Sequence, residues 1–362
     1  MAARSWGFNS PLPHHFGAAG AQEPAIQINR SARRLPGFCA WLLLAGVFLQ
    51  FCEPVFAWND EGHMAVAFLA YRKLEPAKRE RVNALLKLNP YYSSWRAAIP
   101  AGTSKADTDS MIFMIASTWP DQIRTDPKYM DDGPNNGNLP GGPEASRNIG
   151  YTDYLRHKYW HFIDVPFSQD GTPLPPVPSP NAQTQIATFR QALGSAQSDD
   201  VKSYDLVWLE HLVGDIHQPL HAITRISAKM PAGDAGGGLA LLCAAPCRNT
   251  LHLFWDRLVG DQSSIDFPSK TLTLAEEIKA AEIAAKALPA ADPRMAQEAN
   301  ESEWVQESFE AAKRYVYVGP VAAAMGPYTM TTDYFKTAKS VAGQRVALAG
   351  ARLASLINGS LK

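Results

Sequence analysis

Positive charge, cysteine and β-strand patterning are all scarce in this sequence of 362 residues. The first 57 residues carry four of the 34 basic and two of the 35 acidic residues, so the rest of the chain has 30 basic and 33 acidic residues and a net charge of −3. That balance supplies no basic surface for binding duplex nucleic acid by charge alone. If the protein acts on polyanions, the positive charge must come from somewhere else.

Only two of the 4 cysteines, Cys243 and Cys247, lie outside the first 57 residues. In an oxidising compartment, a C-x3-C pair favours a disulfide that closes a small loop. Two cysteines alone make a weak zinc site, because a structural zinc ion usually takes four Cys or His ligands. We therefore expect a disulfide between Cys243 and Cys247.

A membrane-length hydrophobic run is missing near the start of the chain, where only a short one occurs. Phe38–Phe51 (FCAWLLLAGVFLQF) follows three arginines and leads to the sequence VFA. A basic region, a short apolar region and a small–x–small end are typical of a secretory signal, whereas a membrane helix needs about 20 apolar residues. We expect residues 1–57 to be a leader that is removed after Ala57. The protein would then be periplasmic or secreted and begin at Trp58.

Helical patterning dominates the remaining 58–362, in which no repeat of fixed period occurs. Proline and glycine cluster at 131–142, 171–180 and 233–238, which predicts loops there. Periodicity and end signals predict the following helices: 65–74, 76–88, a helix from the N-cap Asn181 through Leu193, 203–218, 274–287, 301–315 and 337–357. The sequence therefore predicts one all-α domain.

Several histidines of this domain occur at helical spacing from aspartates. His211 and Asp215 lie at i, i+4 on one predicted helix, where two ligands can converge on one metal or on neighbouring metals. His252 and Asp256 repeat that spacing. Pro219 breaks or kinks the helix after Asp215, which can turn His221 towards a separate but nearby site. Histidine with carboxylate and no thiolate suits zinc at a hydrolytic site.

Other histidines and aspartates carry weaker signals. His157 and His217 are assigned structural roles, because neither has an acidic partner at a helical spacing. Asp121 in the WPD motif has two interpretations, as a metal ligand or as the cap of a short helix that contains Arg124. His161 lies in the WHFID motif, which by itself is not specific.

Taken in order, these motifs resemble the trinuclear-zinc, single-strand-specific nucleases, which share a superfamily with the bacterial zinc phospholipases C. The motifs are W-x4-H from Trp58, WPD, WHFID, H-x3-D-x5-H and H-x3-D. H-x3-D-x5-H is moderately specific alone, while the ordered set is highly specific. The resemblance spans 58–362 and implies a mostly helical domain with long loops around a cleft that holds three zinc ions.

The resemblance also implies which residues hold each zinc ion. The ligands of the first would be Asp121, His161, His211 and Asp215. The second would share Asp215 as a bridge and take His63 with the α-amino nitrogen and carbonyl oxygen of Trp58. The ligands of the third would be His221, His252 and Asp256.

The implied activity is endonucleolytic hydrolysis of single-stranded DNA and RNA to 5′-phosphate products, with 3′-nucleotidase activity. Asp121, Arg124 and Asp215 would be catalytic, with Arg124 on the phosphate, while Phe162 would stack on the base and Asp164 would hydrogen-bond it. Three zinc ions would make the cleft positive, which reconciles an acidic protein with an anionic substrate. Single strands suit such a cleft, because their bases can swing out and stack on an aromatic ring. A monomer without stable membrane association is expected.

The chain departs from the family pattern at two positions near the base-binding side. Gly238 stands where the glycine loop usually ends in asparagine, and Thr250 stands two residues before His252, where asparagine is usual. Asn249 lies one residue earlier. The base preference therefore stays open, as does the preference for RNA or DNA as the substrate. The insertion 239–248 either changes the shape of the base-binding side or is only a loop that the Cys243–Cys247 pair stabilises.

Two other functions compete with the nuclease hypothesis. A zinc phospholipase C would use the same metal scaffold on a phospholipid headgroup, but its last metal carboxylate is usually glutamate, whereas this chain has Asp256. The short spacing from Trp58 to His63 also resembles the nucleases. A non-catalytic zinc-binding protein would have saturated coordination and no arginine for a substrate.

Overall fold

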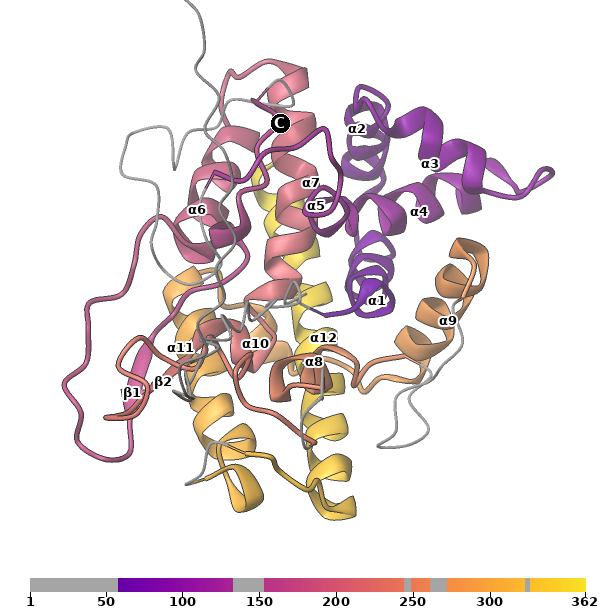
Figure 1. Ribbon diagram of the computed structural model, residues 1–362. Coiled ribbons are helices and arrows are strands. Elements are labelled where there is room, and N and C mark those ends of the chain that lie inside the picture. Colours follow the sequence, from indigo (N-terminus) through magenta and orange to yellow (C-terminus); the bar gives the residue numbers. More distant parts are fainter. Residues whose placement is uncertain (1–57, 133–152, 244–248, 261–271, 323–325) are drawn as a thin grey trace, which may run out of the picture. The chain divides into compact units, whose positions relative to one another are not determined.

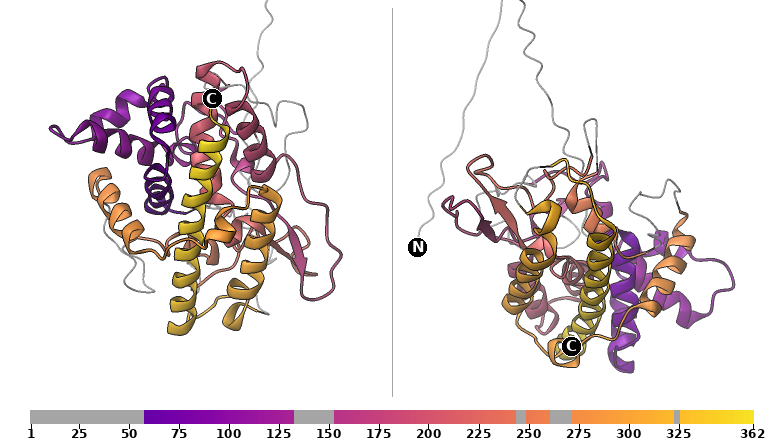
Figure 2. Two further views of the ribbon diagram at one scale, coloured as in Figure 1. Left: turned by 180° about the vertical axis from the view of Figure 1, so that it is seen from behind. Right: turned by 90° about the horizontal axis from the view of Figure 1, so that it is seen from below.

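The described residues of this computed structural model are 58–132, 153–243, 249–260, 272–322 and 326–362. They belong to the unit Phe51–Lys362, in which helices dominate (Figures 1 and 2). The predicted all-α class is confirmed. The leader predicted for 1–57 and the residue Cys247 lie outside the described residues, so the cleavage and the disulfide stay predictions.

The N-terminal half of this unit forms short helices and turns. They are α1 (Asp60–Tyr71), α2 (Pro76–Leu86), α3 (Tyr92–Ala98), α4 (Lys105–Ala116), α5 (Trp119–Gln122) and the 3-10 turn η3 (Lys158–Trp160). The remaining helical elements are α6 (Ala182–Leu193), α7 (Asp199–Asp215), η4 (Pro219–Ala222), α8 (Leu251–Asp256), α9 (Leu274–Ala287), α10 (Pro293–Ala296), α11 (Glu301–Ala311), the π-turn η5 (Ala312–Val316), η6 (Gly319–Val321) and α12 (Thr332–Ser360).

Strands are confined, in the described part of the chain, to one short parallel pair. β1 (Pro166–Ser168) pairs with β2 (Thr224–Ile226), in the register Pro166 opposite Thr224. The pair joins the segment after His161 to the segment after His221, so it ties together two stretches that carry predicted ligands.

Polar caps set the helix starts. Asn181 accepts a hydrogen bond from Thr184 N in a capping box, which confirms the predicted start of α6. Asn59 and Ser198 cap α1 and α7 by accepting hydrogen bonds from Gly62 N and Val201 N. Both helices therefore begin before the predicted 65 and 203, and α7 ends at Asp215 rather than residue 218. The predicted helix 301–315 is α-helical only to Ala311 and continues as η5.

Helix α7 lies at the centre of the helix packing. It contacts α6, α12, α1 and α2, and α1 packs in turn on α12, α4 and α9 (Figures 1 and 2). Every residue from Lys202 to Asp215 is buried. A helix buried all round is held rigidly by its neighbours, so the side chains that α7 carries are fixed in place.

Two buried arginines join α12 to the end of α7. Arg352 forms a bidentate pair with Glu307 of α11, at 2.7 and 2.8 Å, and Arg345 reaches Glu307 at 3.1 Å. Arg345 Nε also donates to the carbonyl oxygen of His217.

None of the helices in the described segments has the length and apolar character that crossing a membrane requires.

The contact between α12 and α1 depends on a glycine. A Cβ atom at Gly350 would lie 2.6 Å from Leu69 Cβ and 3.0 Å from the carbonyl oxygen of Val66. Gly350→Ala is therefore expected to lower the free energy of unfolding by about 1–3 kcal/mol, through overpacking. Gly359→Ala in the same helix is the matched control, since nothing lies within 4 Å of that position. Urea denaturation measures both, and equal effects would contradict this packing.

Candidate metal centre

Asp215 of α7 lies among three imidazoles. Its Oδ2 atom is 3.2 Å from His211 Nε2 and 3.1 Å from His161 Nδ1, and its Oδ1 atom is 3.3 Å from His63 Nε2. His211 and Asp215 face the same side because they are four residues apart on the helix. His63 comes from α1, and His161 follows η3 directly.

Asp121 of α5 completes this first cluster. Its Oδ1 atom lies 3.7 Å from His161 Nδ1 and 3.8 Å from His211 Nε2, and its Oδ2 atom lies 4.0 Å from His63 Nε2. The capping interpretation of Asp121 is not supported, because Asp121 lies inside α5 and no side chain caps that helix. Its carboxylate faces the histidines instead.

A second cluster contains His221 of η4 with His252 and Asp256 of α8. The Nε2 atoms of the two histidines are 2.9 Å apart, and His252 Nε2 is 3.6 Å from Asp256 Oδ1. Helix α7 ends before Pro219, as the sequence predicts. Pro219 then begins the 3-10 segment η4, which carries His221. Thr250 caps α8 by accepting a hydrogen bond from Leu253 N at 3.1 Å. The departure at Thr250 thus has a structural role in the helix that carries two predicted ligands.

Backbone carbonyl oxygens orient three of these imidazoles. The Nδ1 atoms of His211, His221 and His252 donate to the carbonyl oxygens of Ser117, His161 and Gly236, at 2.7, 2.7 and 2.8 Å respectively. A histidine that donates from one ring nitrogen presents the other as a ligand atom. In each case the Nε2 atom therefore faces the cluster.

Glycines allow the close approach of these groups. A Cβ at Gly214 would lie 2.9 Å from His63 Nδ1, and one at Gly236 would lie 2.4 Å from the carbonyl oxygen of Leu220. Gly236 also has a φ of 56°, in the left-handed region that favours glycine. The predicted glycine loop at 233–238 thus lies against His252, whose Nδ1 donates to the carbonyl oxygen of Gly236.

Burial and mutual charge control protonation in the clusters. Burial alone would raise the pKa of Asp215, but His211 and the hydrogen bond from His161 hold that pKa well below its usual range. Burial would lower the pKa of His211, but Asp215 and Asp121 outweigh it and raise the pKa to about 9. Burial raises the pKa of Asp256 well above the usual value, and the hydrogen bond from Gln218 offsets only part of that rise.

The donor set of both clusters fits divalent metal ions. Eight imidazole and carboxylate groups form three sets of three, two of which share His211, and all are buried. Within the described ranges, the buried atoms that lack a hydrogen-bond partner include His63 Nε2, Asp121 Oδ2, Asp215 Oδ1 and Asp256 Oδ2. Buried polar atoms without partners are costly, and a bound cation would satisfy them. Imidazole and carboxylate without thiolate suit zinc.

Trp58 lies between the two clusters at the start of the described chain. Its indole Nε1 donates to the carbonyl oxygen of Gly214 at 3.0 Å, next to Asp215. The following amide, Asn59 N, donates to the carbonyl oxygen of Asp256 at 2.9 Å. The backbone of Trp58 is thus fixed beside two predicted ligands.

The predicted substrate residues lie on the same two segments as the ligands. Arg124 is 5% exposed, and its Nη1 is 3.3 Å from Asp121 Oδ1. Phe162 and Asp164, which flank Ile163 after His161, are both half-buried. Burial, with Asp234 nearby, raises the pKa of Asp164 to about 7.

Two features of the centre were not predicted from the sequence. Gln218 Nε2 donates to Asp256 Oδ1 at 2.7 Å, and the only signal for this contact is its place in HQPLH beside His221. The carbonyl oxygens that orient the imidazoles have no sequence signal at all, because every residue has one.

The reason for a structural assignment of His157 is wrong. His157 does have an acidic partner four residues away, Asp153, and its Nε2 lies 2.8 Å from Asp153 Oδ2. His217 lies outside both clusters, where its Nδ1 donates to the carbonyl oxygen of Val213 and its Nε2 is 3.0 Å from Arg352 Nη1.

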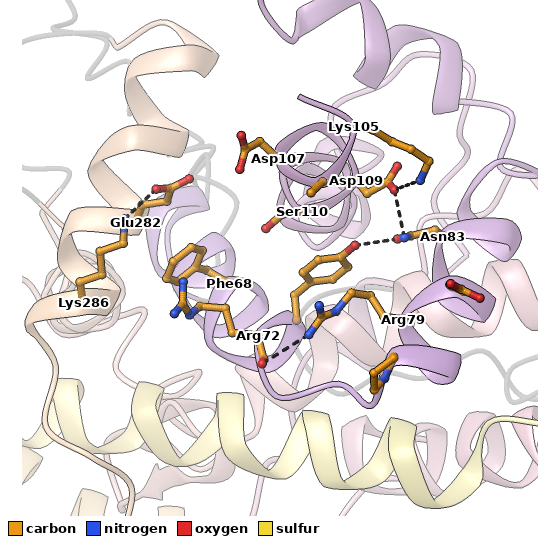
Figure 3. Close-up of a pocket in the computed structure, with 14 residues that line it drawn as sticks. Phe68, Arg72, Arg79, Asn83, Lys105, Asp107, Asp109, Ser110, Glu282 and Lys286 are labelled. Carbon is orange, nitrogen blue, oxygen red and sulfur yellow. Dashed lines mark hydrogen bonds and ion pairs between the residues drawn. The ribbon is translucent and has the colours of Figure 1, made fainter. Parts of the chain in front are cut away.

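A separate cavity of about 760 Å³ opens between α1, α2, α4 and α9 and contains none of the predicted ligands (Figure 3). Its charged groups largely pair with one another. Lys105 pairs with Asp109, and Lys286 pairs with Glu282 while lying over the ring of Phe68. Arg72 and Arg79 also line the cavity, and Arg79 donates to the backbone carbonyl oxygens of Arg72 and Leu74.

A helical scaffold with clustered, buried imidazoles and carboxylates defines a class of metal-dependent hydrolases. The sequence model of one family, described as S1/P1 Nuclease, matches residues 58–362. The chain therefore belongs to the S1/P1 nuclease family and is a hydrolytic nuclease.

Known relatives agree over nearly the whole chain. Endonuclease 4 of Arabidopsis thaliana is 25% identical over 335 residues, which is 88% of this chain and 94% of that protein. Endonuclease 1 of the same plant is 25% identical over 348 residues, 91% of this chain and 93% of that protein. Endonuclease 5 is 23% identical over 330 residues, 88% of this chain and 95% of that protein.

A bound cation should stabilise the fold. Zinc added to chelator-treated protein is expected to raise the melting temperature, because a ligand at 100 times its dissociation constant adds about 2.7 kcal/mol. Asp215→Asn should lose most of that rise, since three imidazoles face this carboxylate. Asp199→Asn, an exposed carboxylate paired with Arg81, is the control and should keep it. A zinc-independent melting temperature in the wild type would contradict the assignment.

Proposed function

We propose that this nuclease is an exported, zinc-dependent endonuclease that hydrolyses single-stranded DNA and RNA to 5′-phosphate products and also acts as a 3′-nucleotidase. The observation that carries this proposal is the convergence of eight buried imidazole and carboxylate groups from α1, α5, α7, η4, α8 and the η3 segment. Membership of the S1/P1 nuclease family supports the substrate class.

Three zinc ions are proposed, and the proximity of the imidazole and carboxylate groups supports each ligand set. The first takes Asp121, His161, His211 and Asp215, the second takes His63 and Asp215 with the terminal backbone of Trp58, and the third takes His221, His252 and Asp256. When bound, zinc lowers the pKa of a coordinated water to about 7 and polarises phosphoryl oxygens.

The remaining site residues bind and orient the substrate. The guanidinium of Arg124 would contact the phosphate and offset its developing negative charge, and its contact with Asp121 supports this role. Phe162 offers its ring for stacking beside the cleaved bond, and Asp164 offers a hydrogen bond to the base edge. Phe162 and Asp164 lie one and three residues after His161. The base would therefore be recognised from the segment of His161, and the phosphate from the segment of Asp121 and Arg124.

Export supplies the free amino group that this centre needs. Cleavage after Ala57 would leave Trp58 as the first residue, with its α-amino nitrogen available as a ligand. The buried indole, hydrogen-bonded to Gly214, then serves to fix the terminus. A periplasmic or secreted monomer with a Cys243–Cys247 disulfide completes the proposal.

A panel of substrates tests this function directly. Purified, zinc-loaded protein is expected to hydrolyse denatured DNA, RNA and a 3′-nucleotide, and to leave phosphatidylcholine intact. Activity on the lipid alone would replace the proposal by a zinc phospholipase C. Activity on none of the four would favour a non-catalytic zinc-binding protein and contradict the assignment as an enzyme.

The raised pKa of Asp164 predicts a pH-dependent step in substrate binding. Below its pKa of about 7 the carboxyl is neutral and can both donate to and accept from a base, whereas above it the carboxylate only accepts. The KM for a single-stranded oligonucleotide should therefore rise severalfold between pH 6 and pH 8.

Asp164→Asn is the matched variant, because its side chain cannot ionise. The step in KM should disappear in this variant, while pH effects on kcat that arise at the metal ligands should persist in both proteins. An identical KM step in wild type and variant would contradict a role for Asp164 in base binding.

A further inference from the structure

His157 is a fully buried histidine that neither the metal centre nor the proposed substrate site uses. It lies four residues before His161, and its backbone has a φ of 44°, in the left-handed region. Its ring lies between two carboxylates, one four residues away and one 25 residues away in the sequence. Nδ1 is 2.7 Å from Asp132 Oδ2, and Nε2 is 2.8 Å from Asp153 Oδ2.

The geometry sets the charge of this ring. An ionised carboxylate accepts hydrogen bonds but cannot donate them, so each ring nitrogen must carry a proton to make both contacts. A ring with two N–H groups is an imidazolium. Burial lowers the pKa of His157, but the hydrogen bonds to Asp132 and Asp153 outweigh burial and raise the pKa above its usual value.

The surrounding groups stabilise the same arrangement. The hydroxyl of Tyr159 donates to Asp132 Oδ2 at 2.6 Å, and that of Tyr204 donates to Asp153 Oδ2 at 3.3 Å. The backbone amide of His157 donates to Asp132 Oδ1 at 2.8 Å. The nearest basic side chains, those of Arg156 and Lys158, pair instead with Asp131.

A chain of ring contacts leads from His157 to the metal centre. The His157 ring stacks on Trp160, with centroids 3.6 Å apart and an interplanar angle of 4°. Trp160 packs edge-on against Trp208 of α7 at 4.9 Å, and Trp208 meets the ring of His161 at 5.5 Å. A cation over an indole face is attracted to it, so the charge of His157 strengthens this stack.

We propose that His157 is a positioning residue: as an imidazolium between Asp132 and Asp153, it holds Trp160 against Trp208 and so fixes the imidazole of His161 in the metal centre. The inference rests on the proposed role of His161 as a zinc ligand. It differs from a general packing role, because it ties the charge of His157 to the affinity for one particular metal ion.

The test is a variant that removes the charge of His157 together with one of its two carboxylates. In His157→Gln/Asp132→Asn, Asp153 can still accept hydrogen bonds from Tyr204 and from the glutamine amide, so the protein should fold. Competition with a zinc chelator should show one zinc ion bound about 10- to 100-fold more weakly, the range seen when groups that orient a ligand are removed. The zinc ion at His221, His252 and Asp256 should keep its affinity.

Arg352→Gln is the control, because it removes a comparably buried cation–carboxylate contact in α12. It should lower the melting temperature without weakening any zinc ion. Unchanged zinc affinities in the folded double variant, or equal weakening in the control, would overturn the inference. These outcomes are independent of nuclease activity, so a wild type that binds zinc but cleaves no nucleic acid would refute only the proposed function.

NMR of the wild-type protein provides a second measurement that needs no variant. Both ring N–H protons of His157 should be observed at pH 7, and the ring should titrate only above its usual pKa of about 6.5. The stabilisation from this raised pKa is complete below pH 6.5 and is lost as the pH rises through the raised value. A neutral ring at pH 7 would overturn the inference.

Discussion

The carboxylate of Asp215 is fully buried, and three imidazole nitrogens lie within 3.3 Å of its two oxygens. Much of the structure serves to hold this group of charges in place. Helix α7 is buried along the stretch that carries it, Gly214 lets His63 approach, and the carbonyl oxygen of Ser117 orients His211. The site gathers ligands from several elements, which become a centre only when the helices pack.

The residues that the sequence proposes as ligands lie close together in the structure, although several of the elements that carry them begin or end elsewhere than predicted. His211 and Asp215 were identifiable because an i, i+4 pair must share a helix face, and Pro219 indicated where that helix ends. The start of α7 was misplaced because Ser198 caps it a full turn before the hydrophobic pattern becomes clear. The proposed ligands at isolated positions, such as Asp121 and His161, had only weak local signals and depended on resemblance to a family.

Long-range contacts set the limit of prediction from one sequence. The pairing of Asp132 with His157 joins residues 25 apart, and no periodicity indicates it. The carbonyl oxygens that accept hydrogen bonds from the imidazoles are equally unpredictable from the sequence, because any residue supplies one. Thr250 shows the same limit in reverse: it looked like a departure from a family pattern, but in the structure it caps the helix of His252 and Asp256.

The proposed centre also depends on the predicted cleavage after Ala57. Trp58 is anchored at both its indole and the amide that follows it, beside Asp215 and Asp256. N-terminal sequencing of the exported protein, combined with analysis of its bound metal, therefore tests the account most directly. Trp58 should be the first residue, with about three zinc ions per chain. A different terminus with full activity, or an active protein without zinc, would contradict it.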